Sequence, residues 1–340
     1  MEDKIIGGEI QIEEDVLKGT IKRDVDIQYS LGRTCLYAIL KTLKKSSRVE
    51  KVLLPDYVCN SVGEVPIRLR IPIKHYHIHS NFCPDMDDIR HIISNSKKNV
   101  AIILISYFGL IDLDEVIINI RLEFQDTIII MDDVQNYYGF GNHNDFDYCF
   151  TSYRKWFAVP DGADVLSKSS SLEIEKYSQQ ARYINYKVAG NLLKNYRDMV
   201  EDEISLELLS KGEDMMDSEY RFCCSEVSRC LLQRMDFELI ANKRRVNAKY
   251  LHEGLERIGI KHVYYSKNVP LFLPILVGNR DSLRERLFKR NIFAPIHWPL
   301  KDKKLQGENK LYEEELSLIC DHRYNIKDME RILNEIESSM

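Results

Sequence analysis

A lysine near the middle of the chain follows one strand-like run, and a carboxylate and an amide follow another. Lys155 comes shortly after Tyr148–Ser152, while Asp132 and Gln135 come after Thr127–Met131. A lysine amine can form a Schiff base with an aldehyde, a carboxylate can keep a pyridine nitrogen protonated, and an amide can contact a phenolic oxygen. Taken singly, Asp132 is also typical of a turn or helix cap, and a lysine beside an arginine is typical of a solvated pair.

A glycine and a threonine stand just before another helical pattern. Gly32, Arg33 and Thr34 open the segment Arg33–Leu43, and the free amides at a helix N-terminus can bind a phosphate group. The alternative is an ordinary capped helix. The phosphate-binding segment at residues 32–34, the amine of Lys155, the carboxylate of Asp132 and the amide of Gln135 together predict a site for pyridoxal 5'-phosphate (PLP). We expect no metal ion at this site.

The elements that must position these residues alternate between short apolar runs and amphipathic stretches. The apolar runs predict buried, mainly parallel strands, at Lys51–Leu54, Val100–Tyr107, Thr127–Met131, Tyr148–Ser152 and Ala163–Leu166. Helices are expected between them, at Arg33–Leu43, Asn60–Leu69, Asp85–Ser94 and Leu113–Leu122. This order predicts an α/β domain with helices on both faces of its sheet.

The second half of the chain changes character. Its composition turns helical and charged, and a long helix is expected over Asp236–Leu255. Beyond it we expect strands at Lys261–Tyr265 and Pro270–Val277 and helices at Asp281–Lys289 and Lys327–Ile336, the last capped by Asn325. We therefore predict two domains, a large α/β domain over residues 1–235 and a small α+β domain over residues 236–340.

Composition excludes several classes of partner. The net charge of −5 gives no electrostatic footprint for nucleic acid, and no apolar run reaches the length of a membrane-spanning helix. Eight cysteines without CxxC spacing, in a chain that opens on Met1-Glu2-Asp3, predict a reduced cytoplasmic protein. His75, His77 and His79 alternate, but they lack Cys or carboxylate partners at ligand spacing, so a metal interpretation is not favoured.

At this point several segments resemble the fold-type I PLP enzymes, and within them the DegT/StrS family of sugar aminotransferases. The matching segments extend over most of the chain: Ser30–Thr34, Leu54–Cys59, Ser106–Gly109, Met131–Gln135, Ala294–Pro299 and His322–Tyr324. The resemblance implies that Lys155 carries the Schiff base, Asp132 contacts the pyridine nitrogen, Gln135 contacts the phenolic oxygen and Ser152 binds the phosphate. It also implies that four residues reach the substrate from the small domain: His297, Trp298, Arg323 and Tyr324.

The chain departs from that family at identifiable positions. Ser106 stands where the family commonly has a histidine, so stacking on the cofactor ring is expected from Tyr57 or Tyr107, and the sequence does not choose between them. Phe150 stands where the family has its usual phosphate-binding serine. Asp133, next to Asp132, is expected to tolerate substitution.

The resemblance implies a homodimeric PLP-dependent aminotransferase. It would transfer an amino group from an amino-acid donor, expected to be glutamate, to a keto group of a nucleotide-linked sugar. One alternative is another PLP-dependent reaction on an amino acid, such as desulfuration, which needs a nucleophilic cysteine, although Cys320 is expected to be a buried apolar residue. A sugar dehydratase of this family would lack the lysine. A further alternative is a non-catalytic protein that keeps the fold.

Overall fold

A six-stranded sheet forms the centre of the computed structural model, which describes residues 4–11, 14–17, 27–96, 99–168, 173–194, 202–218 and 220–339. The strand order is β3-β2-β4-β5-β6-β7. The strands are β2 (Lys51–Pro55), β3 (Ile73–Tyr76), β4 (Val100–Ile105), β5 (Ile128–Asp132), β6 (Tyr148–Ser152) and β7 (Ala163–Ser167). All neighbours are parallel except β7, which runs antiparallel to β6 at one edge.

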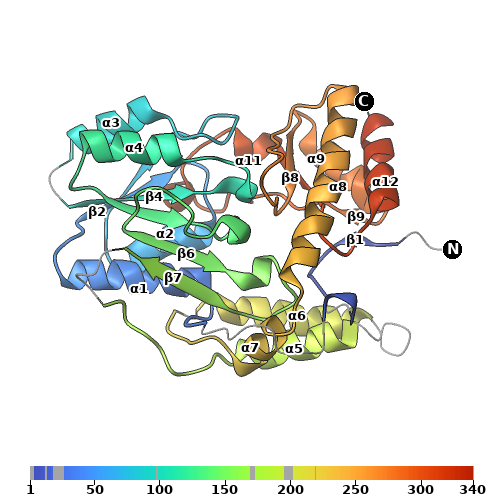
Figure 1. The fold of residues 1–340 in the computed structure, drawn as a ribbon, viewed down its shortest axis with the longest axis horizontal. Coiled ribbons are helices and arrows are strands. Elements are labelled where there is room, and N and C mark those ends of the chain that lie inside the picture. The colour runs from blue at the N-terminus through green and yellow to red at the C-terminus, as the bar shows by residue number, and fades with distance from the viewer. Residues whose placement is uncertain are drawn as a thin grey trace.

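Helices cover this sheet on both faces. Figure 1 shows α3 (Met86–Ser94) and α4 (Asp114–Glu123) on one side and α1 (Gly32–Lys45) on the other, with α2 (Asn60–Arg68) behind the sheet. Helix α1 packs against β6 and β7. Because both faces are covered, every residue of β4, β5 and β6 is buried. This explains why their sequences are nearly continuous apolar runs.

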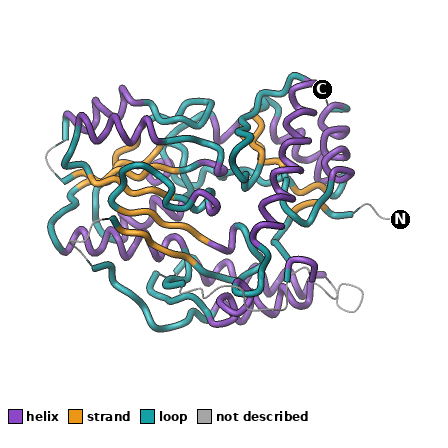
Figure 2. The backbone as a smooth tube through the Cα atoms, in the orientation of Figure 1, coloured by secondary structure: helices purple, strands orange, loops and turns teal. Residues whose placement is uncertain are grey.

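After the sheet, the described part of the chain forms four helices and then a smaller layer of helices and short strands. These helices are α5 (Tyr183–Lys194), α6 (Asp202–Met216), α7 (Glu226–Leu232) and the long α8 (Phe237–Ile258). The following elements are β8 (Leu273–Leu276), α9 (Arg280–Lys289), β9 (Ile292–Phe293), α10 (Lys303–Gln306), α11 (Leu311–Glu314), β10 (Glu315–Leu318) and α12 (Ile326–Glu337). Figure 2, in the orientation of Figure 1, shows α8, α9 and α12 with the short strands β8 and β9 at one side of the main sheet. Strand β10 pairs antiparallel with β8, and α8 and α12 pack against each other.

The amino-terminal segment joins this smaller layer. Strand β1 (Ile6–Gly7) pairs in parallel with β9, and the Ile6 N–H donates a hydrogen bond of 2.9 Å to the Asn291 carbonyl. A boundary between residues 1–235 and 236–340 stays a prediction, and the first strand contacts the second of these parts.

The predicted α/β class with a mainly parallel sheet is confirmed. The five predicted strands and four predicted helices of the first half are present, although the strand predicted to reach Tyr107 ends at Ile105. Asn325 caps α12 in a capping box, as predicted. The predicted strand Lys261–Tyr265 is wrong: the segment makes a single bridge, between His262 and Ile275. Among the described residues, no helix combines the length and apolar character needed to cross a membrane.

Candidate active site

The register of the sheet brings the predicted chemical groups to one edge. Asp132 ends β5, pairs with Ile105 on one side and Phe150 on the other, and lies at the carboxyl end of parallel strands, where α/β folds bind their ligands. A cavity of about 750 Å³ opens there. It is lined by nine of the predicted site residues: Gly32, Arg33, Asp132, Gln135, Ser152, Lys155, His297, Trp298 and Arg323.

Lys155 ends a short 3-10 turn (Tyr153–Lys155) that follows β6 directly. Trp156 and Phe157 are buried and hold this turn against the protein, while Lys155 is exposed on the cavity that it lines. The neighbouring positive charge of Arg154 is the largest cause that lowers the pKa of Lys155, to about 8. A fraction of the amine is therefore neutral near physiological pH, as a nucleophile or base requires.

Asp132 is a buried carboxylate with little to balance its charge. Its Oδ1 accepts a hydrogen bond of 3.0 Å from the Val134 N–H, and the residue is 4% exposed. Burial raises the pKa of Asp132 to about 7; the bond from Val134 opposes this shift, and the Asp133 charge adds to it. A protonated pyridine nitrogen in the cavity would supply the missing cation.

Gln135 is oriented by the backbone. Its Oε1 accepts a hydrogen bond of 2.8 Å from the Phe108 N–H, which identifies this atom as the amide oxygen. The Nε2 group is therefore the end of the amide that can donate to a ligand oxygen. This polarity suits an acceptor such as a phenolate.

The first turn of α1 lines the cavity through Gly32 and Arg33, and its N-cap, Leu31, offers no capping side chain. A Cβ on Gly32 would lie 2.9 Å from Val134 Cγ2, so only glycine fits this close approach. Ser152, 3% exposed, also lines the cavity. Thr34 does not: it is fully buried, and its hydroxyl lies 3.2 Å from the Ser30 hydroxyl.

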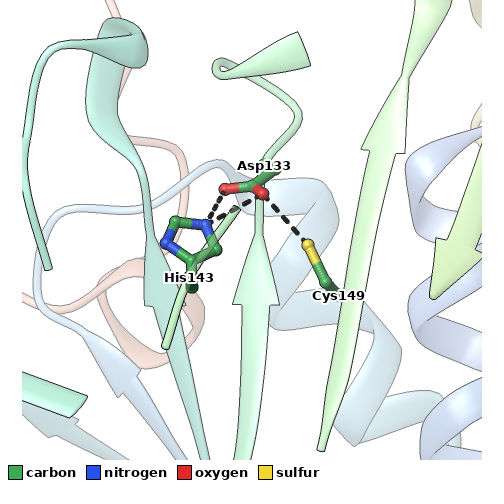
Figure 3. Close-up of side chains that lie close together, drawn as sticks. All are labelled: Asp133, His143 and Cys149. Atoms are coloured by element: carbon green, nitrogen blue, oxygen red, sulfur yellow. Dashed lines mark hydrogen bonds and ion pairs between the residues drawn. The ribbon is translucent and has the colours of Figure 1, made fainter. Parts of the chain in front are cut away.

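Asp133 is held far more firmly than the sequence indicated. It is fully buried and accepts hydrogen bonds from Ser106 Oγ (2.6 Å), His143 Nε2 (2.9 Å), Cys149 Sγ (3.0 Å) and the Gly141 N–H (3.0 Å). Figure 3 shows the His143 and Cys149 side chains directed at the two carboxylate oxygens. This network fixes the end of β5 beneath Asp132. No spacing in the sequence predicted it.

Tyr57 and Tyr107 do not line the cavity. The Tyr107 hydroxyl donates to the Tyr57 carbonyl, and the Tyr57 hydroxyl lies 3.4 Å from Glu315 Oε2. The Trp298 ring, which does line the cavity, packs against both, with ring centroids 5.3 Å from Tyr57 and 6.3 Å from Tyr107. The two tyrosines therefore pack behind Trp298, and Trp298 supplies an aromatic surface of the cavity.

The predicted substrate residues of the tail differ in how free they are. His297 lines the cavity, its Nδ1 lies 2.8 Å from Ser317 Oγ, and burial, followed by the Lys155 charge, lowers its pKa to about 3, so its ring is neutral. Arg323 lines the cavity but is hydrogen-bonded to Asp321 and to the carbonyls of Gly8 and Glu9. Tyr324 does not line the cavity, and its hydroxyl accepts a 2.7 Å bond from the Gly7 N–H. Arg323 and Tyr324 thus anchor the amino-terminal segment.

A cluster of ion pairs on the cavity wall was missed from the sequence. Lys187 Nζ donates to Glu213 Oε1 at 2.7 Å and also to Glu9, and Arg154 donates to Glu213 at 3.2 Å. Burial alone would raise the pKa of Glu213, but Arg154 and Lys187 lower it to about 2. The partners are distant in sequence, so no local motif signals the cluster.

The alternating histidines have separate partners. His77 Nδ1 contacts Asp56 at 2.7 Å, His79 contacts Asp85 at 3.6 Å and His75 contacts the Leu305 carbonyl at 3.3 Å. Cys320 is fully buried, and burial raises the pKa of its thiol to about 12. Cys59, by contrast, lines the cavity at the N-cap of α2.

Solved structures share this fold. An aminotransferase of the DegT/DnrJ/EryC1/StrS group from Brucella abortus matches with a TM-score of 0.63 at 17% identity, over 92% of this chain and 85% of that one. DesI, solved in the presence of its TDP-sugar product, matches with a TM-score of 0.63 at 13% identity, over 89% and 78%. A NifS-like protein from Rickettsia africae matches with a TM-score of 0.57 at 15% identity, over 92% and 80%. No protein-family model and no curated protein matches the sequence.

These likenesses show that the fold is that of the fold-type I PLP-dependent enzymes. The residues of the cavity fit the cofactor on their own terms. The buried carboxylate of Asp132 suits the ring nitrogen, and the amide of Gln135 suits the phenolic oxygen. The amine of Lys155, with its lowered pKa, suits the aldehyde, and the helix N-terminus at Gly32 suits the phosphate.

Proposed function

We propose that this chain is a PLP-dependent aminotransferase that moves an amino group from an amino acid, such as glutamate, to a keto group of a nucleotide-linked sugar. The observation that carries the proposal is the meeting of Lys155, Asp132, Gln135 and the N-terminus of α1 in one cavity. Among the structural neighbours, CalS13 from Micromonospora echinospora is a sugar aminotransferase and DesI was solved in the presence of its TDP-sugar product, and both support the acceptor class.

PLP, when bound, supplies an aldehyde that exchanges amines and a ring that accepts electrons from the substrate carbon. Asp132 would keep the proton on the pyridine nitrogen, because its buried negative charge is otherwise under-compensated. Gln135 would donate its Nε2 hydrogen to the phenolic oxygen. The amides at Gly32 and Arg33, with Ser152, would bind the phosphate.

Lys155 would first hold the cofactor and then move the proton between substrate and cofactor. Its pKa near 8 allows Nζ both to take and to return a proton near neutral pH. Trp298, Phe157 and Phe272 line the cavity and would exclude water from this transfer. The neutral ring of His297 adds no competing positive charge.

The cavity favours an anionic ligand. Its lining contains eight Lys and Arg side chains against six of Asp and Glu, and it is large enough for more than the cofactor. A net positive lining attracts both the cofactor phosphate and the diphosphate of a sugar nucleotide.

The test is to follow the visible spectrum of the purified holoprotein through the two halves of the reaction. Glutamate should convert the cofactor to its aminated form, and a keto-sugar nucleotide should restore the original spectrum. Restoration by amino-acid-derived keto acids alone, with none by any keto-sugar nucleotide, would instead identify an amino-acid aminotransferase. No response to any amino donor would favour a non-catalytic protein.

A second candidate function rests on Cys59. Its thiol lines the same cavity, 3.2 Å from the Ser61 hydroxyl, so a nucleophile for desulfuration is available where Cys320 is not. In that reaction the Cys59 thiolate would take the sulfur of a cysteine substrate as a persulfide, and the substrate would leave as alanine. Alanine formation with one persulfide per chain, released as sulfide by an added dithiol and abolished by Cys59→Ser, would support this reaction. Amino transfer that is unaffected by Cys59→Ser would favour the first proposal.

We also propose a homodimer in a reducing compartment. Two-fold dimers are the commonest oligomers, and the enzymes that the sequence resembles complete their sites with a second subunit. All eight cysteines are free thiols, which supports the cytoplasm. Sedimentation equilibrium would contradict the dimer if it showed a stable monomer with full activity.

A further inference from the structure

Three potential metal ligands meet at the end of α8, outside the cavity. His252 and Glu256 are one helical turn apart on α8, and His262 follows shortly after the helix ends. His252 Nδ1 lies 2.8 Å from His262 Nε2, which in turn lies 3.6 Å from Glu256 Oε1. None of the three lines the active-site cavity.

The His262 ring is fixed in the orientation that a metal ligand needs. Its side chain is 3% exposed, and Nδ1 lies 2.7 Å from the Ile260 carbonyl. Since a carbonyl only accepts, Nδ1 carries the hydrogen, and in the neutral ring the lone pair is on Nε2, facing His252. A histidine that donates its other N–H to a backbone carbonyl is the usual outer-shell arrangement at metal sites.

The His252 ring is held by aromatic stacking. Its ring stacks on Tyr264, with centroids 4.3 Å apart and planes at 22°. The two imidazoles therefore face each other in fixed positions. Glu256 is 66% exposed, so its carboxylate can turn inward without breaking a buried contact.

The two distances from His262 Nε2 to the other ligand atoms suit one small ion. Metal–nitrogen bonds of about 2.0–2.1 Å at tetrahedral or octahedral angles place neighbouring ligand atoms roughly 2.9–3.4 Å apart. The observed 2.8 and 3.6 Å are within a few tenths of an ångström of that range.

The buried group Asp133, His143 and Cys149 contrasts with this site, although its ligand atoms are equally close. There the carboxylate already receives hydrogen bonds from both partners, from Ser106 and from a backbone N–H. An ion would have to displace donors that satisfy a buried charge. At His262 an ion would replace one hydrogen bond between two imidazoles and would keep the Glu256 carboxylate as a neighbour.

We propose that His252, Glu256 and His262 bind one divalent transition-metal ion such as Zn²⁺, with water in the remaining positions. The ion joins the end of α8 to residue 262, which bridges to Ile275 of β8. It thereby stabilises the small layer of helices and strands and leaves the chemistry of the cavity unchanged.

The experiment titrates the chelator-treated full chain with Zn²⁺ alone, against a chromophoric chelator, and records thermal unfolding. We expect one Zn²⁺ ion to bind tightly to each chain and to raise the unfolding temperature. Co²⁺ should give visible bands typical of nitrogen and oxygen ligands. Glu256→Gln should weaken Zn²⁺ binding at least ~10-fold, and His252→Gln or His262→Gln more strongly.

Glu253→Gln, on the exposed face of α8, and His91→Gln, on α3, are the matched controls and should bind like the wild type. Because His262 is buried, its variant must first be shown to fold. Glu256 is exposed, so Glu256→Gln tests the proposal even if the His262 variant does not fold. Absence of a tight equivalent, or equal affinity in the wild type, Glu256→Gln and His252→Gln, would overturn the proposal.

Discussion

Ser106 donates a hydrogen bond of 2.6 Å to the Asp133 carboxylate and does not line the cavity. In the family that the sequence resembles, a histidine commonly stands at this position. In this chain Ser106 links the end of β4 to the end of β5 by this hydrogen bond. Trp298 supplies an aromatic surface on the cavity. The position that the resemblance assigns to ring stacking therefore stabilises, in this chain, the carboxylate next to the one that lines the cavity.

Replacing the amine should remove cofactor chemistry without unfolding the protein. We expect Lys155→Ala to lose the visible absorption of the PLP-loaded protein and its turnover, with an unchanged circular dichroism spectrum, because the side chain is exposed on the cavity. Lys249→Ala, on the surface of α8, is the control and should behave like the wild type. A fully active Lys155→Ala protein would refute the assignment.

The buried carboxylate at residue 132 should destabilise the cofactor-free protein as pH rises. Its pKa is raised to about 7 in the folded state, above the usual value, so the folded state binds the extra proton and loses stability between about pH 4 and 7. Asp132→Asn removes this cost. We expect the cofactor-free variant to gain stability over the wild type across this range, by up to about 4 kcal/mol.

The same variant should be a poor enzyme. With cofactor, Asp132→Asn should turn over at least ~100-fold more slowly, because the amide cannot hold the ring nitrogen proton by charge. Urea denaturation of the cofactor-free protein and steady-state kinetics of the loaded protein measure the two effects separately. A variant with normal turnover, or no gain in stability at pH 7, would contradict the proposed pairing.

Asp133→Asn should have the opposite effect on folding. The substitution replaces an acceptor of four hydrogen bonds with an amide that cannot accept them all, and a buried unpaired donor costs about 1–3 kcal/mol. We expect a lower urea midpoint than that of the wild type. Asp126→Asn, at an exposed position, should leave the midpoint unchanged. The expectation that turnover tolerates a change at Asp133 better than one at Asp132 stays a prediction.

Gly32→Ala should weaken cofactor binding. The new methyl group would lie 2.9 Å from a γ-carbon of the stiff Val134 side chain, so the first turn of α1 must move away from the cavity. We expect at least a ~10-fold loss of PLP affinity, measured by equilibrium dialysis. Gly278→Ala is the matched control, since its methyl group would meet nothing within 4 Å. Equal affinities in the two variants would exclude this phosphate cradle.

Much of the fold was predictable because it depends on local pattern. Buried parallel strands leave apolar runs, and Asn325 leaves a cap signature. The edge strand β3 was not predicted, because its sequence Ile-Lys-His-Tyr carries a weak pattern. The candidate site was predictable where its residues follow strand ends, as Asp132 and Lys155 do.

Other parts of the site depend on contacts that sequence order does not reveal. The cluster of Glu9, Lys187 and Glu213 joins three separate segments. The position of Tyr57 and Tyr107 behind Trp298 depends on how the tail packs onto the sheet. Composition and spacing can nominate aromatic residues, but only tertiary packing decides which of them reaches the cavity.

The pairing of β1 with β9 has a consequence for the order of assembly. Ile6 aligns with Ile292, so the chain must be synthesised through residue 292 before β1 has its partner. Contacts of such long sequence separation form slowly, because the entropy of closing the long intervening loop opposes them. Gly8, Glu9 and Ile10, which continue from β1, line the cavity. The central sheet can therefore form early, while the part of the cavity wall that residues 8–10 supply is completed only when β1 has paired with β9.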